Sequence, residues 1–142
     1  MAELSEETHS QIARLCERGD QLAENGVFDE ALKLYNAALA LLPEPKSDWE
    51  ATLWIYAAIG DSQFLSRDYA SAKTTFVEAI TEHGGVGNPF LHLRLGQTHY
   101  ELEDMDAAAE ELTRAYGLEG VEIFQEDDVK YLDFLRTRIE MK

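Results

Sequence analysis

Apolar side chains recur along most of this chain at spacings of three and four residues, which is the period of an α-helix with one buried face. The most regular stretch covers residues 19–43. Within it, Ala31, Tyr35 and Ala38 fall on one helical face. Pro43 ends the helix, because proline cannot continue the hydrogen-bond ladder. This stretch therefore predicts two amphipathic helices joined by a tight turn.

The same period continues along the chain and predicts seven helices, with no alternating pattern of the kind that indicates a strand. Helix starts are indicated by side chains that accept hydrogen bonds from free backbone N–H groups. The expected N-terminal residues are Ser5, Asp29, the Ser47/Glu50 pair, Asn88 followed by Pro89, and Asp127 or Asp128. The Ser47/Glu50 pair has the spacing of a capping box and places the start of the third helix near Asp48. Gly117 and Gly120 are expected to end the sixth helix.

Three glycines in the chain are each followed by the same arrangement of side chains. An alanine comes twelve residues after each glycine, a large ring or leucine sixteen residues after it, and a second alanine nineteen residues after it. The three sets are Gly19 with Ala31, Tyr35 and Ala38; Gly60 with Ala72, Phe76 and Ala79; and Gly96 with Ala108, Leu112 and Ala115. This arrangement resembles the tetratricopeptide repeat, a helix–turn–helix unit of about 34 residues.

The resemblance implies an all-α fold, an α–α superhelix of about seven antiparallel helices in a single domain over residues 1–142. The expected units are about 12–45, 53–86 and 89–122, followed by a capping helix at about 127–140. The segment PEPKSDW lengthens the first unit, so the third helix is expected to begin more than a turn early. Small residues are expected to let the two helices of a unit lie close, while the aromatic side chain fills the gap between units.

The composition adds a strong negative charge. The chain has a formal net charge of −16, with 45% hydrophobic residues and a single cysteine, Cys16. A lone cysteine forms no internal disulfide, and neither a long apolar run nor a signal-peptide pattern is present, so a cytoplasmic location is expected. Charge repulsion argues against nucleic acid and anionic membranes as partners and favours a basic protein, although an acidic surface also serves solubility alone.

Proteins of the tetratricopeptide repeat family bind partners in a concave groove lined mainly by the first helix of each unit. Carried over by position, the resemblance implies a partner-binding groove that contains Asp20, Glu24, Trp54, Asp61, Phe64, Phe90, Gln97, Tyr100 and Glu101. This set is aromatic and acidic, which suits a partner segment with apolar and Lys or Arg side chains. The alternative for some of the aromatic residues, above all Phe64, is packing between helices.

Heat-shock co-chaperones of this family hold a C-terminal carboxylate with Lys, Asn and Arg side chains. The corresponding positions here are occupied by Cys16, Asp20, Phe90 and Arg94, of which at most Arg94 matches. An acidic chaperone tail is therefore not expected as a partner of this chain.

The sequence contains no arrangement of side chains that indicates catalysis, a metal or a cofactor. His92 and His99 are seven residues apart, roughly 10 Å along a helix, whereas metal ligands on one helix need a spacing of three or four, so core histidines are expected. The acidic turn at 101–106 lacks the glycine and distal glutamate of a calcium loop, and the glycines at 84–87 lack the Lys-Ser/Thr of a phosphate loop. Cys16 has no evident histidine partner. We expect a protein that is not an enzyme and uses no cofactor.

These observations predict a non-enzymatic protein-binding module. The most specific hypothesis is an acidic immunity protein that binds and neutralises a basic toxin domain, because an acidic inhibitor associates rapidly with a basic active site. The alternatives are a small secretion chaperone of the type III class that holds an apolar translocator segment, and a scaffold or adaptor subunit. The expected partner is a basic protein, either a toxin domain or a secreted effector. The sequence leaves open the oligomeric state and the choice among groove, convex face and loops as the binding surface.

Overall fold

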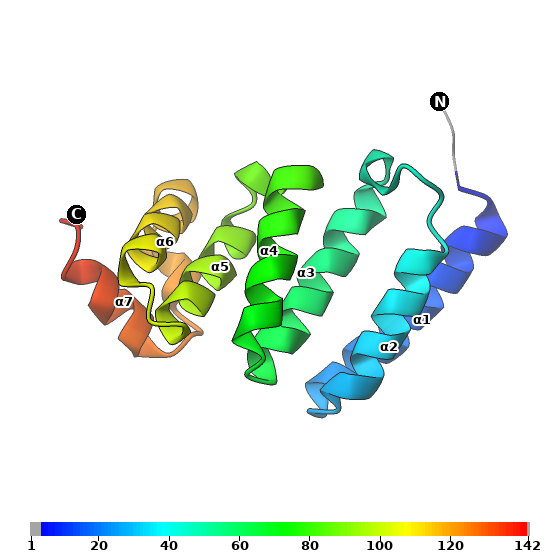
Figure 1. The fold of residues 1–142 in the computed structure, drawn as a ribbon, viewed down its shortest axis with the longest axis horizontal. Helices are drawn as coiled ribbons and strands as arrows, with labels where there is room; N and C mark the ends of the chain where they lie inside the picture. Colours follow the sequence, from blue (N-terminus) through cyan, green and yellow to red (C-terminus); the bar gives the residue numbers. More distant parts are fainter. Residues whose placement is uncertain (1–3, 142) are drawn as a thin grey trace.

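The computed structural model describes residues 4–141, which form a row of α-helices packed as antiparallel pairs (Figure 1). The helices are α1 (Glu6–Glu24), α2 (Phe28–Ala40), α3 (Glu50–Leu65), α4 (Tyr69–Glu82), α5 (Pro89–Glu101), α6 (Met105–Glu119) and α7 (Val129–Arg136). Three short 3-10 helices lie between them, η1 (Lys46–Asp48), η2 (Gly85–Gly87) and η3 (Val121–Phe124). No strand occurs within residues 4–141, and the predicted all-α superhelix is confirmed. None of the helices in this range is long and apolar enough to cross a bilayer.

Within each helix pair, a glycine of the first helix lies directly against a large side chain of the second. A Cβ atom added to Gly19 would lie 2.7 Å from Tyr35 Cε1. The same distance is 2.5 Å for a Cβ atom on Gly60 and Phe76 Cε1, and 2.7 Å for one on Gly96 and Leu112 Cγ. Non-bonded carbon atoms need about 3.5 Å, so only glycine permits this approach. The ring therefore fills the space inside a unit. The ring also reaches the gap between units, as predicted, since Tyr35 shares a buried cluster with Ile55 of α3 and Phe76 shares one with Leu91 of α5.

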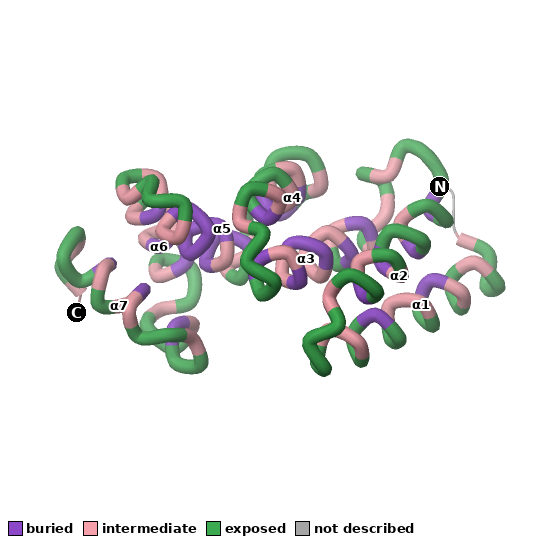
Figure 2. Tube along the Cα trace, turned by 60° about the horizontal axis from the view of Figure 1, so that its bottom comes forward, coloured by how far each residue is buried: buried purple, intermediate pink, exposed green. Residues whose placement is uncertain are grey.

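The buried core consists of three clusters, and each one extends from a helix pair into the elements that follow it. The first cluster joins Tyr35 of α2 to Ile55 of α3. The second joins Phe76 of α4 to Leu91 of α5, and the third includes Leu135 of α7. Figure 2 shows buried positions where neighbouring helices meet along the row and exposed positions on its outer sides. Each pair therefore depends on the next helix to bury its apolar face, as expected for a repeat protein.

Three of the expected N-terminal residues cap their helices. Ser5, Asn88 and Asp128 each accept a hydrogen bond from a backbone N–H group of the first turn, at 3.0–3.2 Å. Asp29 does not cap α2, because this helix begins one residue earlier, at Phe28, and has no side-chain cap. Local capping chemistry thus accounts for three of the expected helix starts, whereas α2 begins without a side-chain cap.

The Ser47/Glu50 pair does not form a capping box. Ser47 lies inside η1, and α3 begins at Glu50, directly after an extended Trp49. The 3-10 helix takes up three of the seven residues of the PEPKSDW segment, and the extended Trp49 ends that segment. As a result, α3 begins only three residues before position 53, and the prediction of a start more than a turn early is wrong.

Two predicted helix ends also differ from the structure. Gly117 lies inside α6, and Gly120, with a φ of +79°, ends this helix instead. The capping helix α7 ends at Arg136, followed by Thr137 as its C-cap, and is therefore shorter than the predicted range of 127–140. The unit boundaries themselves stay a prediction.

Candidate functional site

An open pocket lies between α1 and α3, the first helices of the first two units. Its volume is about 280 Å³. The walls are mainly apolar and include Ile12, Ala13 and Cys16 from α1 and Trp54, Ile55 and Ala58 from α3. The pocket exists because alanine and cysteine side chains on the facing helices are too small to fill the space between them.

Two of the predicted groove residues, Asp20 and Trp54, meet at this pocket. Trp54 is 67% exposed, which is unusual for so large an apolar side chain. Asp20 is exposed as well, and its Oδ1 accepts a hydrogen bond of 2.6 Å from the Tyr35 hydroxyl. Burial, followed by this hydrogen bond, raises the pKa of Tyr35, so the hydroxyl remains a donor at neutral pH. The result is an apolar pocket with an indole at its rim and a carboxylate at its edge.

Cys16 is part of the pocket wall and is partly buried. Burial, and to a smaller extent the nearby Asp20 carboxylate, raises the pKa of the Cys16 thiol. A thiol that stays protonated is a poor nucleophile and a poor metal ligand. Cys16 therefore serves as a small wall residue of the pocket.

Arg94 of α5 occupies the next part of the groove, where the sequence pattern predicted only aromatic and acidic side chains. Its side chain is 14% exposed. Its guanidinium donates to Asp61 Oδ1 of α3 at 2.7 Å and to Asp127 Oδ1, just before α7, at 3.1 Å. It also donates to Gln97 Oε1 at 2.8 Å. Arg94 thus connects α3, α5 and the segment that leads into α7, and it neutralises the Asp61 carboxylate.

The same guanidinium lies over two aromatic rings. Its Cζ atom is 4.9 Å from the centroid of Phe64 and 5.4 Å from that of Phe90. Both distances fall within the range of a cation–π interaction. Two of the predicted groove aromatics are therefore already engaged by a cation of the chain itself.

The third part of the groove is covered by α7. Tyr131 of α7 is buried, and its ring packs edge-on against Tyr100 of α5 at 5.3 Å between centroids. Phe134 packs against Tyr100 at the same distance. Glu101 Oε1 accepts hydrogen bonds from Lys130 Nζ at 2.5 Å and from the Tyr131 hydroxyl at 3.1 Å. Tyr100 and Glu101 therefore hold the capping helix.

The structure thus divides the predicted groove into the pocket between α1 and α3 and a part occupied by internal contacts, in which Phe90 remains 37% exposed. Asp20 and Trp54 lie together at the open pocket, and Glu24 is exposed at the end of α1. Phe64 is only 8% exposed and Gln97 is fully buried, so the expectation that they face a partner is wrong. Their positions lie on the first helices, as predicted, but Arg94 and α7 cover that side of the helices.

Sequence reasoning named Arg94 only as a match to a carboxylate-holding position and missed its internal ion pairs, because the positions were weighed one repeat at a time. A signal was available in the sequence. Arg94 is the only Lys or Arg of α5, and it stands four residues after Phe90 and three before Gln97, on the same helical face. A lone cation on a face that also carries Phe90 and Gln97 favours an ion pair with a neighbouring element.

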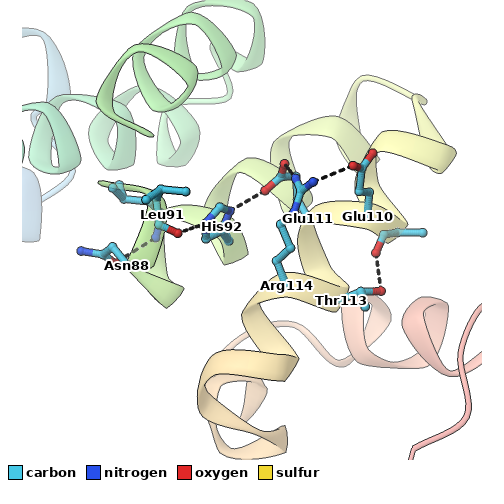
Figure 3. Close-up of polar contacts among 9 residues, drawn as sticks. Asn88, Leu91, His92, Glu110, Glu111, Thr113 and Arg114 are labelled. Carbon is cyan, nitrogen blue, oxygen red and sulfur yellow. Dashed lines mark hydrogen bonds and ion pairs between the residues drawn. The ribbon is translucent and has the colours of Figure 1, made fainter. Parts of the chain in front are cut away.

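The histidines of α5 are core residues, as predicted. His92 Nδ1 lies 2.6 Å from Glu111 Oε2 of α6, and its Nε2 lies 2.6 Å from the carbonyl oxygen of Val86 (Figure 3). Glu111 in turn accepts a hydrogen bond from Arg114. His99 is 8% exposed, and burial lowers its pKa. His92 thus joins α5 to α6 and to the segment before α5.

A row of antiparallel helix pairs with an open pocket between first helices defines the class of an α-helical repeat protein with a protein-interaction surface. The sequence matches two family models, both described as tetratricopeptide repeat, over residues 8–81 and 57–120. The first match covers more than half of the chain, and this chain belongs to the tetratricopeptide repeat family. A comparison with curated protein sequences gives no match.

Three solved structures with the same fold are each 17% identical in sequence to this chain. The first tetratricopeptide repeat domain of Spaghetti (RPAP3), bound to the HSP90 peptide SRMEEVD, has a TM-score of 0.69 and covers 90% of this chain and 92% of that chain. The first such domain of human RPAP3 has a TM-score of 0.68, with 89% and 88% covered. PcrH in complex with the chaperone binding region of PopB has a TM-score of 0.65, with 96% of each chain covered. At this identity, the likeness shows the fold.

Proposed function

We propose that this chain is a non-enzymatic protein-binding module that holds an apolar side chain of a partner segment in the pocket between α1 and α3. The observation that supports this function is the combination of an open apolar pocket with a rim tryptophan, Trp54, that is 67% exposed. Large exposed aromatic side chains beside a pocket are typical anchors of protein interfaces.

The dimensions of the pocket favour a side chain over a small-molecule cofactor. Its volume of about 280 Å³ lies just below the roughly 300–1,000 Å³ of small-molecule sites. Asp20 at the edge has acceptor capacity beyond its bond to Tyr35 and would receive a backbone N–H group or a flanking Lys or Arg of the partner. The expected ligand is therefore an apolar anchor followed by a donor group.

The charge of the groove supports the chaperone or adaptor alternative more than toxin neutralisation. Asp61 and Glu101 were expected to attract a basic partner, but Arg94 and Lys130 already hold them. The structure of PcrH with the chaperone binding region of PopB adds support for a chaperone role, because it shows this fold with a segment of another protein. An acidic peptide such as the one bound by RPAP3 is not proposed, since Arg94 is engaged internally.

A second candidate function is the neutralisation of a basic toxin domain, and the net charge of −16 is the observation that favours it. Because Asp61 and Glu101 are paired with Arg94 and Lys130, this function would use exposed acidic residues such as Glu24. Both candidates place the protein in the cytoplasm.

The test is to isolate the chain with its native partner, identify that partner by mass spectrometry, and then measure its affinity for variants. Trp54→Ala is expected to weaken binding by about 2 kcal/mol, roughly thirtyfold, if the pocket holds the anchor. Val129→Ala, an exposed apolar residue of α7, is the matched control and is expected to leave the affinity unchanged. Equal affinity of the Trp54→Ala variant and the unmodified chain would refute the proposal.

The contribution of charge is measured in the same experiment. Asp20→Asn removes the pocket carboxylate without adding a like charge, whereas substitution of Asp61 or Glu101 by lysine would also break the internal pairs with Arg94 and Lys130. The pocket proposal expects Kd to change little with salt. A fall of more than about tenfold in affinity between low and physiological salt, with Trp54→Ala neutral, would favour the toxin-binding candidate.

A further inference from the structure

A cluster of three side chains with metal-binding atoms lies at the C-terminal end of α4, outside the pocket between α1 and α3. Glu78 and Glu82 are four residues apart on this helix and share one face. His83 is the C-cap residue of the helix. One ligand atom from each of the three residues lies within 4.8 Å of the others. A helix C-terminus favours bound cations, because its free carbonyl groups carry partial negative charge.

His83 distinguishes this cluster from ordinary surface carboxylates. Its side chain is 10% exposed, and neither of its ring nitrogens has a hydrogen-bond partner among the described residues. Buried polar nitrogens in proteins are nearly always paired, so an unpaired imidazole that faces two carboxylates needs an explanation.

The distance between His83 and Glu78 suits a shared metal ion better than a direct hydrogen bond. His83 Nε2 lies 3.5 Å from Glu78 Oε2, longer than the usual hydrogen-bond range of about 2.7–3.2 Å. Two ligands that each lie about 2.0–2.2 Å from a tetrahedral zinc ion are roughly 3.4 Å apart. The two atoms are thus spaced like neighbouring ligands of one ion.

Tyr56 of α3 fixes the orientation of both groups. Its hydroxyl donates to Glu78 Oε2, and its ring stacks beside that of His83 with 4.6 Å between centroids. Metal-binding carboxylates commonly receive such a hydrogen bond from an outer residue.

We propose that His83, Glu78 and Glu82 form a binding site for a divalent transition metal of the zinc class. The protein ligands are His83 Nε2 and one carboxylate oxygen of each glutamate, with water at the fourth position. An imidazole with two carboxylates favours zinc or cobalt over calcium and magnesium, which prefer oxygen ligands only. The proposal is independent of partner binding in the pocket. It revises the prediction of no metal, which considered histidine pairs and did not recognise the Glu-x-x-x-Glu-His pattern.

The test is calorimetric titration of the metal-free chain, without a histidine tag, with Zn²⁺ at physiological salt. One site is expected, and His83→Ala and Glu82→Gln are each expected to weaken it at least tenfold. His9→Ala and Glu119→Gln remove the same residue types at exposed positions elsewhere and are expected to leave the affinity unchanged. Co²⁺ is the spectroscopic probe, and its visible absorption is expected to be lost in His83→Ala.

The outcomes separate a built site from diffuse binding to an acidic surface. No Zn²⁺ binding, equal affinity in His83→Ala, or equal affinity for Mg²⁺ would each overturn the proposal. If His83→Ala does not fold, as judged by circular dichroism, the exposed Glu82→Gln variant decides the question, since its substitution leaves the core intact. Tyr56→Phe is expected to retain the site and weaken it by about tenfold.

Discussion

Replacement of Arg94 by methionine tests whether this side chain holds the C-terminal half of the molecule together. Methionine keeps most of the apolar stem and removes the guanidinium, so the substitution separates charge from packing. It leaves Asp61 and Asp127 without their cation and removes the cation–π contacts with Phe64 and Phe90. We expect lower global stability and, in particular, a less stable α7.

The expected magnitude follows from the contacts of Arg94. A hydrogen bond to a charged group contributes about 1.5–3 kcal/mol, and Arg94 makes one to each of two aspartates. The side chains of Asp61 and Asp127 are 32% and 21% exposed, so water compensates part of the loss. We therefore expect the free energy of unfolding to fall by about 2–4 kcal/mol, below the sum of both bonds.

The assay is urea unfolding followed by far-UV circular dichroism, combined with amide hydrogen exchange. Exchange is expected to accelerate in 129–136 more than in α1, because Asp127 lies two residues before Val129, the first residue of α7. Arg136→Met is the control, since its one ion pair within residues 4–141, with Asp133, is exposed and 3.9 Å long. It is expected to change stability by less than about 1 kcal/mol. A loss of under about 1 kcal/mol for Arg94→Met, with α7 exchange unchanged, would refute the reasoning.

Three further predictions concern the packing and pH dependence of the repeats. Gly60→Ala places a methyl group against Phe76 and is expected to lower the free energy of unfolding in urea by about 1–3 kcal/mol. Gly117→Ala, with open space around it inside α6, is expected to be neutral or stabilising, and equal effects of the two substitutions would contradict the packing argument. Burial lowers the pKa of His99, so the unfolded chain binds a proton that the folded chain does not. Stability is therefore expected to fall as the pH drops below about 6.5, and His99→Gln should reduce that fall; an identical pH profile would exclude this cause. Tyr131→Ala is expected to cost about 3–5 kcal/mol and to expose apolar surface that binds a hydrophobic dye, and a stable variant that binds no dye would show that α7 does not cover the groove.

The fold was predictable from the sequence because its main contacts recur at fixed spacing. Gly19 and Tyr35 are in contact across a helix pair, and the same spacing returns at Gly60 and Phe76. A contact that recurs at fixed spacing produces the same residue pattern in each repeat, and three copies make this pattern recognisable in the sequence. Helix starts were less predictable, because a capping pattern such as that of Ser47 and Glu50 is local, whereas the start of α3 depends on how η1 connects two packed units.

The candidate site was only partly predictable, for a different physical reason. Helical periodicity tells which face a side chain occupies, and it placed Trp54 and Asp20 on the face that forms the open pocket. It does not tell what covers that face. Gln97 and Tyr100 lie on the expected face of α5, but Arg94 donates to Gln97 and α7 packs against Tyr100. The contacts of Tyr100 with Tyr131 and of Arg94 with Asp127 join positions about 30 residues apart that no repeat relates.

The division of the groove limits the length of any segment that binds in it. The open pocket extends only between α1 and α3, because α7 covers the later part through Tyr131 and Lys130. Two adjacent helices, each about 10 Å across, match roughly six residues of extended chain at about 3.3 Å per residue. A segment of that length offers one or two buried anchors. Trp54 and the small side chains opposite it would therefore contribute most of the selectivity among partner segments. A longer segment would have to displace α7 and break the contacts of Glu101, which makes the stability of α7 a determinant of partner length.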